Sequence, residues 1–139
     1  MKELLIETAR RTGILNAEVL EHYLAENAED TRRIDELLLT APGFTEDNVL
    51  KLMAEALGLD YIDEINSSLV PEDFIEKVPA PYAQHHYLIG LETETDSGSM
   101  TIIVANPLNT MVVDNVSRRL QKPVTIAVSS RAVITSAID

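Results

Sequence analysis

The apolar residues in the first part of the chain recur at helical spacing, and this pattern ends near residue 60. It predicts four helices, within residues 1–13, 16–29, 30–40 and 45–58. Asn16 and Thr45 are good N-caps for the second and fourth helices, and Gly13 and Gly58 suit the ends of the first and fourth. The strings TGILNAEVLEHYLA and PGFTEDNVLKLMAEAL share one design, which indicates a weak duplication of a helix pair.

The later sequence favours strands alternating with helices. Two β-favouring runs flank TDSGS, whose residues are typical of a hairpin turn, and KPVTIAVSS predicts a third strand. A short helix is expected at 71–78, a longer one after the cap Asn106 with Pro107 in its first turn, and a last one capped by Ser129 or Ser130. The tyrosine and isoleucine at 61–62 form only a short extended piece.

These patterns predict an α/β (α+β) protein in two parts. Residues 1–66 form a helical subdomain of about four helices in two helix-pair repeats. Residues 67–139 form a small α/β subdomain with a three-stranded sheet in the order β-β-α-β-α. Charge changes at a similar place, because residues 1–69 carry 6 Lys or Arg against 15 Asp or Glu, whereas residues 70–139 carry 5 against 8.

Composition excludes several classes of protein. The net charge of −12 and the absence of Trp argue against nucleic-acid binding, which needs basic surfaces and aromatic platforms. Without Cys there is no disulfide framework and no thiolate nucleophile. No run approaches the roughly 20 apolar residues that span a bilayer, and the start MKELLIETARR is charged too early for a signal peptide. We therefore expect a cytoplasmic protein with no direct membrane insertion.

Neither catalysis nor metal binding is expected. The adjacent His85 and His86 would point to opposite sides of an extended segment, and a metal site needs three or four well-spaced ligands. The carboxylates are dense and flank helices, which is typical of a solvated face rather than of an acid–base pair. No glycine begins a P-loop string of the form GxxxxGK[ST], so this chain does not carry an NTPase core of that kind.

Five strings of the sequence stand out by their order along the chain. They are LMAEALGLDYID (52–63), LVPEDFIEKVP (69–79), YLIGL (87–91), IIVANPLN (102–109) and PVTIAVSSRAVITSAI (123–138). Together they resemble the N-terminal domain of type II secretion and type IV pilus assembly ATPases, an MshEN-like domain. The family's Asp-Pro is Asn106-Pro107 here, and both residue types cap helices.

The resemblance implies a non-catalytic docking or regulatory domain. Such domains bind the cytoplasmic part of an inner-membrane platform protein and lie at the membrane only through that partner. An oligomer is expected only if the chain is attached to a motor domain. A stand-alone interaction protein is a further alternative. Which secretion or pilus system the chain serves is left open by the sequence.

A different function is implied by those family members that bind cyclic di-GMP through two tandem helical motifs. Asp35 stands where the second motif has Gly and would bring a negative charge toward a dianionic ligand. The alternative is that the matching leucines are only the core of the helical bundle. The residues that fall on the motifs are Gly13, Ile14, Leu20, Leu24 and Asn27 in the first copy, and Arg33, Leu38 and Gly43 in the second.

Overall fold

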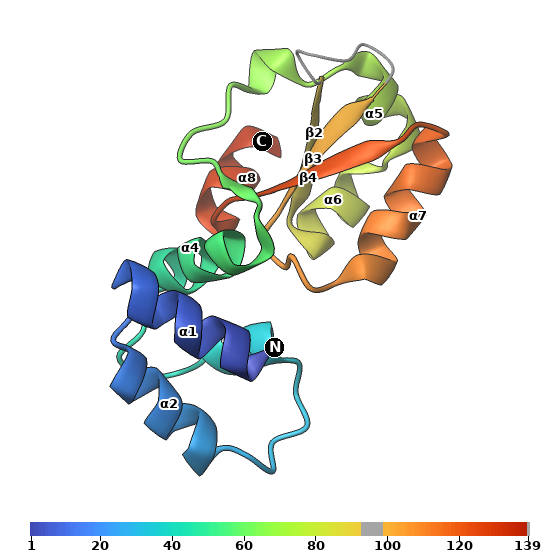
Figure 1. Ribbon diagram of the computed structural model, residues 1–139. Helices are drawn as coiled ribbons and strands as arrows, with labels where there is room; N and C mark the ends of the chain where they lie inside the picture. The colour runs from blue at the N-terminus through green and yellow to red at the C-terminus, as the bar shows by residue number, and fades with distance from the viewer. Residues whose placement is uncertain (93–98, 139) are drawn as a thin grey trace. The chain divides into compact units, whose positions relative to one another are not determined.

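The computed structural model describes residues 1–92 and 99–138, and Figure 1 traces the chain. Most of the expected TDSGS turn lies outside the described residues. The chain divides into two compact units, Met1–Leu59 and Asp60–Asp139. Each unit is described by itself below.

Unit 1 (Met1–Leu59) is made of helices. Asn16 accepts a hydrogen bond from the Val19 amide at 3.0 Å, and Thr45 accepts one from Asn48 at 3.2 Å, so both predicted N-caps are confirmed. Helix α1 contacts α2 and α4, and α3 contacts α4, which closes an apolar core. The helices are α1 (Lys2–Thr12), α2 (Ala17–Glu26), α3 (Ile34–Leu39) and α4 (Glu46–Leu57).

Helix α3 is shorter than predicted. It begins at Ile34 rather than near Asp30, because the Asp30 carboxylate accepts a hydrogen bond from the Arg32 amide at 2.9 Å. Such a local turn competes with the first helical turn for the same amide groups.

Unit 2 (Asp60–Asp139) is built on a mixed sheet with the strand order β1-β4-β3-β2. Strands β1 and β3 pair with β4 in parallel, and β2 pairs with β3 antiparallel. The strands are β1 (Asp60–Tyr61), β2 (Leu88–Glu92), β3 (Met100–Val104) and β4 (Val124–Val128), and the helices are η1 (Ser67–Leu69), α5 (Glu72–Lys77), α6 (Ala80–His86), α7 (Thr110–Leu120) and α8 (Arg131–Ile138).

The fold class is confirmed, but the predicted count of three strands is wrong. The fourth strand, β1, pairs Asp60 with Ala127 and Tyr61 with Val128. The next carbonyl, of Ile62, accepts a hydrogen bond from the buried Ser129 hydroxyl at 2.6 Å. These partners lie more than sixty residues away in the sequence, so no local pattern marks the strand.

Two local predictions in unit 2 are wrong. Asn106 does not cap a helix: its carbonyl accepts a hydrogen bond from the Asn109 amide at 3.0 Å, and α7 begins only at Thr110. A turn therefore separates β3 from α7. His85 and His86 end the helix α6 instead of lying in an extended segment. Ser130 does cap α8, through the Val133 amide at 3.2 Å.

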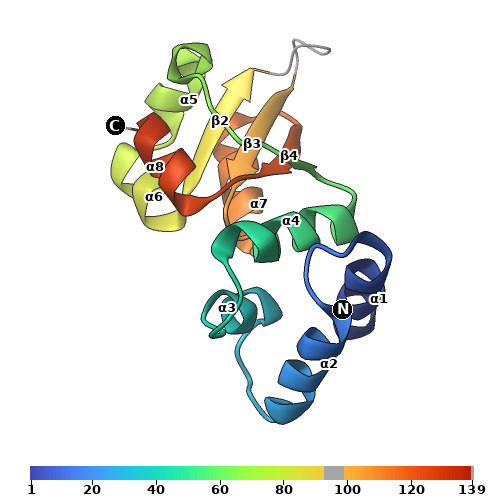
Figure 2. The same ribbon diagram turned by 90° about the vertical axis from the view of Figure 1, so that its left-hand side faces the viewer.

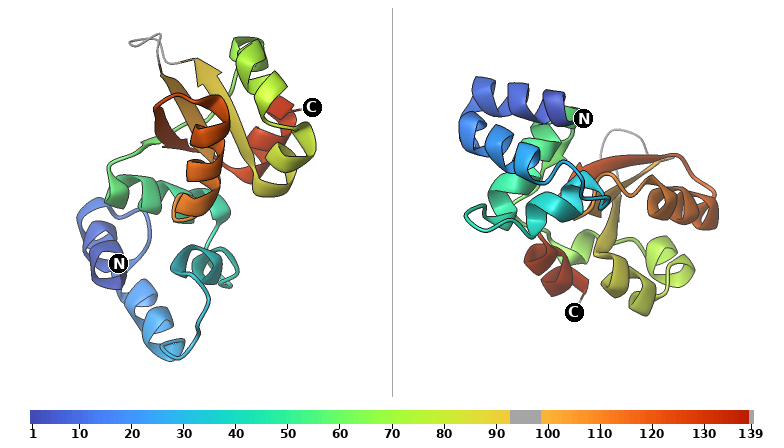
Figure 3. Two further views of the ribbon diagram at one scale, coloured as in Figure 1. Left: turned by 90° about the vertical axis from the view of Figure 1, so that its right-hand side faces the viewer. Right: turned by 90° about the horizontal axis from the view of Figure 1, so that it is seen from below.

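Helices surround the sheet of unit 2. Figure 2 shows α6 and α8 together beside β2, and Figure 3 shows α7 in front of the strands in its left-hand view. The core of the unit joins Phe74 from α5, Ile102 and Ile103 from β3, Val116 from α7 and Ile134 from α8. None of the described helices has the length and apolar content needed to cross a bilayer.

Candidate functional site

The first predicted nucleotide motif lies along α1, α2 and the turn between them. Gly13 ends α1 in the left-handed conformation, at φ 73°, and its amide donates to Ala9. Ile14 follows in the turn and is half-buried. Asn27 ends α2, and its side-chain amide donates to the Tyr23 carbonyl at 2.9 Å. The Gly13 amide and the Asn27 side chain thus satisfy carbonyl groups at the ends of α1 and α2, and this structural role accounts for both residues.

The three leucines of the predicted nucleotide site lie in the core of unit 1. Leu20 and Leu38 are fully buried, and Leu24 is only 3% exposed. Their side chains pack among the helices and present no apolar surface to a ligand. Gly43 is exposed in the turn before α4, at φ 91°.

Arg33 is the predicted phosphate-binding group, and its guanidinium is already engaged by two carboxylates. Its Nε donates to Oδ1 of Asp35 at 2.6 Å, and its Nη2 lies 3.2 Å from Oε1 of Glu36. The hydrogen bond to Asp35 raises the pKa of Arg33 above its ordinary value, so the group stays charged. An incoming phosphate would compete with both acids for this one cation.

Asp35 itself is fully buried beside Arg33. Its Oδ1 also accepts from the Glu36 amide at 3.0 Å, whereas its Oδ2 has no hydrogen-bond partner among the described residues. The carboxyl group expected here from the sequence is therefore present, and Arg33 is its main partner.

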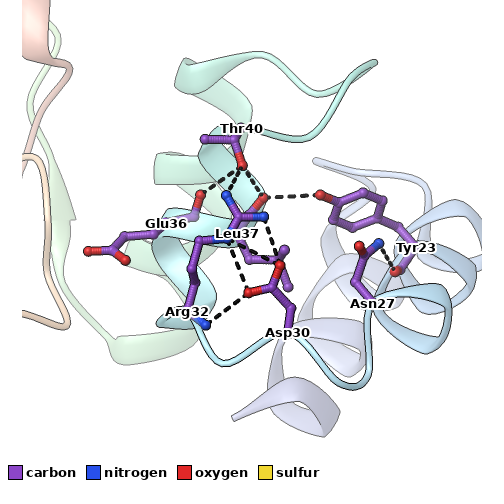
Figure 4. A network of polar contacts seen from close by, with 7 residues as sticks. All are labelled: Tyr23, Asn27, Asp30, Arg32, Glu36, Leu37 and Thr40. Atoms are coloured by element: carbon purple, nitrogen blue, oxygen red, sulfur yellow. Dashed lines mark hydrogen bonds and ion pairs between the residues drawn. The ribbon is translucent and has the colours of Figure 1, made fainter.

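The neighbouring Arg32 belongs to a separate, exposed network, drawn in Figure 4. Its guanidinium donates to the Asp30 carboxylate at 2.8 Å and to the Thr40 hydroxyl at 3.0 Å. The Thr40 hydroxyl and the Tyr23 hydroxyl both bond to the Leu37 carbonyl, at 3.1 and 3.2 Å. The side-chain bond from Arg32 lowers the pKa of Asp30. The network holds the segment before α3 against the end of that helix.

Unit 2 contains a surface hollow that sequence reasoning missed. Its volume is about 320 Å³, and all but one of its lining residues are apolar. We call it the apolar groove; α5 contributes Phe74 and Ile75 to it, α6 Ala83, β2 Ile89 and α8 Ile138, and Val78 follows α5. The walls come from five separate elements, since Ser67 of η1 lines the groove as well, so no single stretch of sequence indicates it. Ile75, which stands between Phe74 and Glu76 in the sequence, is 63% exposed in the folded unit.

The histidine pair shows no metal-binding arrangement. The rings of His85 and His86 lie edge to face, with centroids 4.7 Å apart, and burial and the neighbouring His85 lower the pKa of His86. Over residues 1–92 and 99–138, no three His, Asp or Glu side chains come together in a way that could hold a metal ion.

Comparisons with known proteins give a consistent result. The family model described as MshEN domain matches residues 57–139. The structure of MshE with cdg has a TM-score of 0.69 and 17% identity, over 97% of this chain and 96% of that one. The N-terminal domain of XpsE is similar as well, at 16% identity in two crystal forms. One form has a TM-score of 0.65 over 96% of this chain and 90% of that one. The other has a TM-score of 0.59 over 93% of this chain and 87% of that one. No curated protein matches the sequence significantly.

Proposed function

The chain belongs to the MshEN domain family of secretion and pilus ATPases, and from this premise we propose that it is a non-catalytic docking domain. Its partner in this proposal is the cytoplasmic part of the inner-membrane platform protein of a type II secretion or type IV pilus system. Docking would link the ATPase to the membrane platform and place the domain at the cytoplasmic side of the inner membrane.

The observation that carries this proposal is the apolar groove of unit 2. Ile75 lines it and is 63% exposed, and nine of its ten lining residues are apolar. Clustered apolar surface of this kind is typical of protein-binding sites. In the described part of the chain, no group of His, Asp and Glu side chains could hold a metal ion.

Binding of cyclic di-GMP is a second candidate. It is favoured by the similarity in fold to MshE, whose structure was determined with cdg, over nearly the whole of both chains. The geometry of unit 1 favours it less, because Leu20, Leu24 and Leu38 are buried and Arg33 is held by Asp35 and Glu36.

The test of docking is a calorimetric titration of the whole chain with the cytoplasmic domain of the platform protein from the same system. We expect saturable binding with one site per chain. No binding at concentrations of about 100 µM, which corresponds to weaker than about −5.5 kcal/mol, would overturn the proposal. The cytoplasmic domain from an unrelated system serves as the control for non-specific charge attraction.

The same instrument tests the second candidate, with cyclic di-GMP as ligand and GTP as control at physiological salt. Binding of cyclic di-GMP but not of GTP would make the domain a nucleotide sensor. Arg33→Ala separates the two functions. It should abolish binding of a small anion that depends on one charge-assisted contact, whereas a protein interface spread over many residues should survive in part.

A further inference from the structure

The apolar groove continues into a second hollow on the same unit. This second hollow has a volume of about 470 Å³, and it shares Ser67 and Ala137 with the groove. We call it the acidic hollow, because Asp63 and Glu64 line it together with residues of α8. Helix α8 therefore borders both, with Ala137 and Ile138 toward the groove and Ala132 and Val133 toward the acidic hollow.

The charged side chains that line the two hollows are all acidic. Among the described residues, no Lys or Arg lines either hollow. Asp63 and Glu64 are exposed and form no ion pair within the described part of the chain. Elsewhere in unit 2, Lys77 and Lys122 are both bound to Asp73, at 3.0 and 2.9 Å, and the guanidinium of Arg131, at the start of α8, lies over the Tyr87 ring, 5.8 Å from its centroid. The two carboxylates are thus available to a cation from outside.

A helix is the partner element that fits this surface. The groove is bordered by side chains of α5, α6 and α8, so recognition must come from side chains entering it. An amphipathic helix supplies such anchors from one face, at positions i, i+3, i+4 and i+7. A Lys or Arg one or two turns along that face would lie over the acidic hollow.

We infer that the apolar groove and the acidic hollow together receive one face of a basic amphipathic helix of the partner protein. Apolar side chains of that helix enter between Phe74 and Ile138, and its basic side chains meet Asp63 and Glu64. This inference rests on the proposed docking function and names the chemistry of the partner segment.

The test uses two labelled synthetic helices of about four turns, each with leucine along one face. One carries lysine at the remaining positions and the other carries glutamate. Fluorescence anisotropy with the whole chain should show binding of the lysine peptide and at least about tenfold weaker binding of the glutamate peptide. The cytoplasmic domain of the platform protein should displace the bound lysine peptide.

Ile75→Glu and Met111→Glu form a matched pair of variants. Both replace an exposed apolar side chain on unit 2, at 63% and 72% exposure, so neither should disturb the core. Ile75 lines the groove, whereas Met111 lies on α7 and lines neither hollow. Ile75→Glu should weaken binding of the lysine peptide and of the platform domain by about tenfold or more, and Met111→Glu by less than about twofold.

Reversing the charge of the acidic hollow gives an independent check. The double variant Asp63→Lys, Glu64→Lys should lose affinity for the lysine peptide and gain affinity for the glutamate peptide. Melting curves followed by circular dichroism should show that all the variants fold as the parent does.

The outcomes separate the two proposals. If the platform domain binds the parent and Ile75→Glu equally well, docking stands and the groove inference is wrong. If the platform domain does not bind the parent at all, the docking proposal fails and the inference fails with it. If sedimentation shows that the parent dimerises and that Ile75→Glu does not, the occupant is a second copy of the chain, which also overturns the inference.

Discussion

Phe74 occupies the space that a side chain at position 90 would need. A Cβ atom built on Gly90 would lie 2.5 Å from Cδ2 of Phe74 and 2.7 Å from Sδ of Met100. Both neighbours are buried, so neither can move aside without disturbing the core. Gly90 is therefore required by the packing of α5 against β2.

The first prediction follows from this contact. Gly90→Ala should lower the free energy of unfolding by about 1–3 kcal/mol, as overpacking of a tight core does. Urea denaturation measures the change. The same substitution in a Phe74→Leu background should cost less, since the smaller side chain leaves room. If Gly90→Ala lowers the free energy of unfolding equally in both backgrounds, contact with Phe74 is not the cause of the loss.

The second prediction concerns the hydrogen bond from Ser129 to the Ile62 carbonyl. Ser129 is fully buried, so Ser129→Ala leaves that carbonyl without this bond and should cost about 1–3 kcal/mol in urea denaturation. Ser136→Ala, on the exposed side of α8, is the control and should change stability little. Hydrogen exchange of the Ile62 amide, which donates to Val128, should accelerate in Ser129→Ala alone.

The third prediction concerns the buried carboxylate of unit 1. Arg33→Ala removes the cation beside Asp35 and should lower the stability of the chain by about 1–3 kcal/mol, because a buried charge loses its main partner. Arg32→Ala is the matched control on the adjacent residue. Its ion pair with Asp30 is more exposed than that of Arg33 with Asp35, so a smaller loss, below about 1 kcal/mol, is expected. The double variant Arg33→Ala, Asp35→Asn should recover part of the loss. If it recovers none, the pair does not act as a unit.

The fourth prediction is a dependence of stability on pH. Hydrogen bonds from Lys122 and Lys77 hold the pKa of Asp73 below its ordinary value of 3.8. Because this pKa is lowered by folding, the ion pairs stabilise the fold above pH 3.8. They lose their effect as the pH falls through the pKa that Asp73 has in the folded state. Asp73→Asn should thus be less stable than the parent at pH 6, and the difference should vanish well below pH 3.8.

Denaturant titrations across this pH range measure the effect. Glu76→Gln, on the same helix, is the control because Glu76 forms no ion pair in the described part of the chain. The loss of stability at pH 6 should be larger for Asp73→Asn than for Glu76→Gln. Added salt should shrink the Asp73 effect, since the group is partly exposed.

Local signals in the sequence predicted the parts of the fold that depend on neighbours in the chain. Asn16 and Thr45 cap helices because the side-chain oxygen of each accepts a hydrogen bond from the free amide three residues later, in the first turn of the helix. Gly13 and Gly58 end helices because the chain leaves each helix through a left-handed residue, a conformation that glycine adopts without strain. The parallel pairing of Asp60–Tyr61 with β4 depends instead on residues brought together by the whole unit.

The candidate site was less predictable for a physical reason. A leucine stripe such as Leu20 and Leu24 looks the same in sequence whether it packs in a core or on a ligand, and only burial distinguishes the two. The apolar groove is indicated even less by the sequence. Its walls come from five elements whose separations are set by packing, so the exposure of Ile75 was visible only in the folded unit.

The shortness of β1 has a mechanical consequence. Residue 59 ends unit 1, so tension carried along the chain from that unit enters the sheet at β1 first. The two paired residues of β1 and the two hydrogen bonds of Ile62, to Val128 and from Ser129, must bear that load, whereas β2, β3 and β4 are held together by five-residue pairings. Peeling β1 alone would lengthen the tether between the units and leave the three-stranded remainder intact. The strand that joins the sheet to the preceding unit is thus also its most weakly held strand.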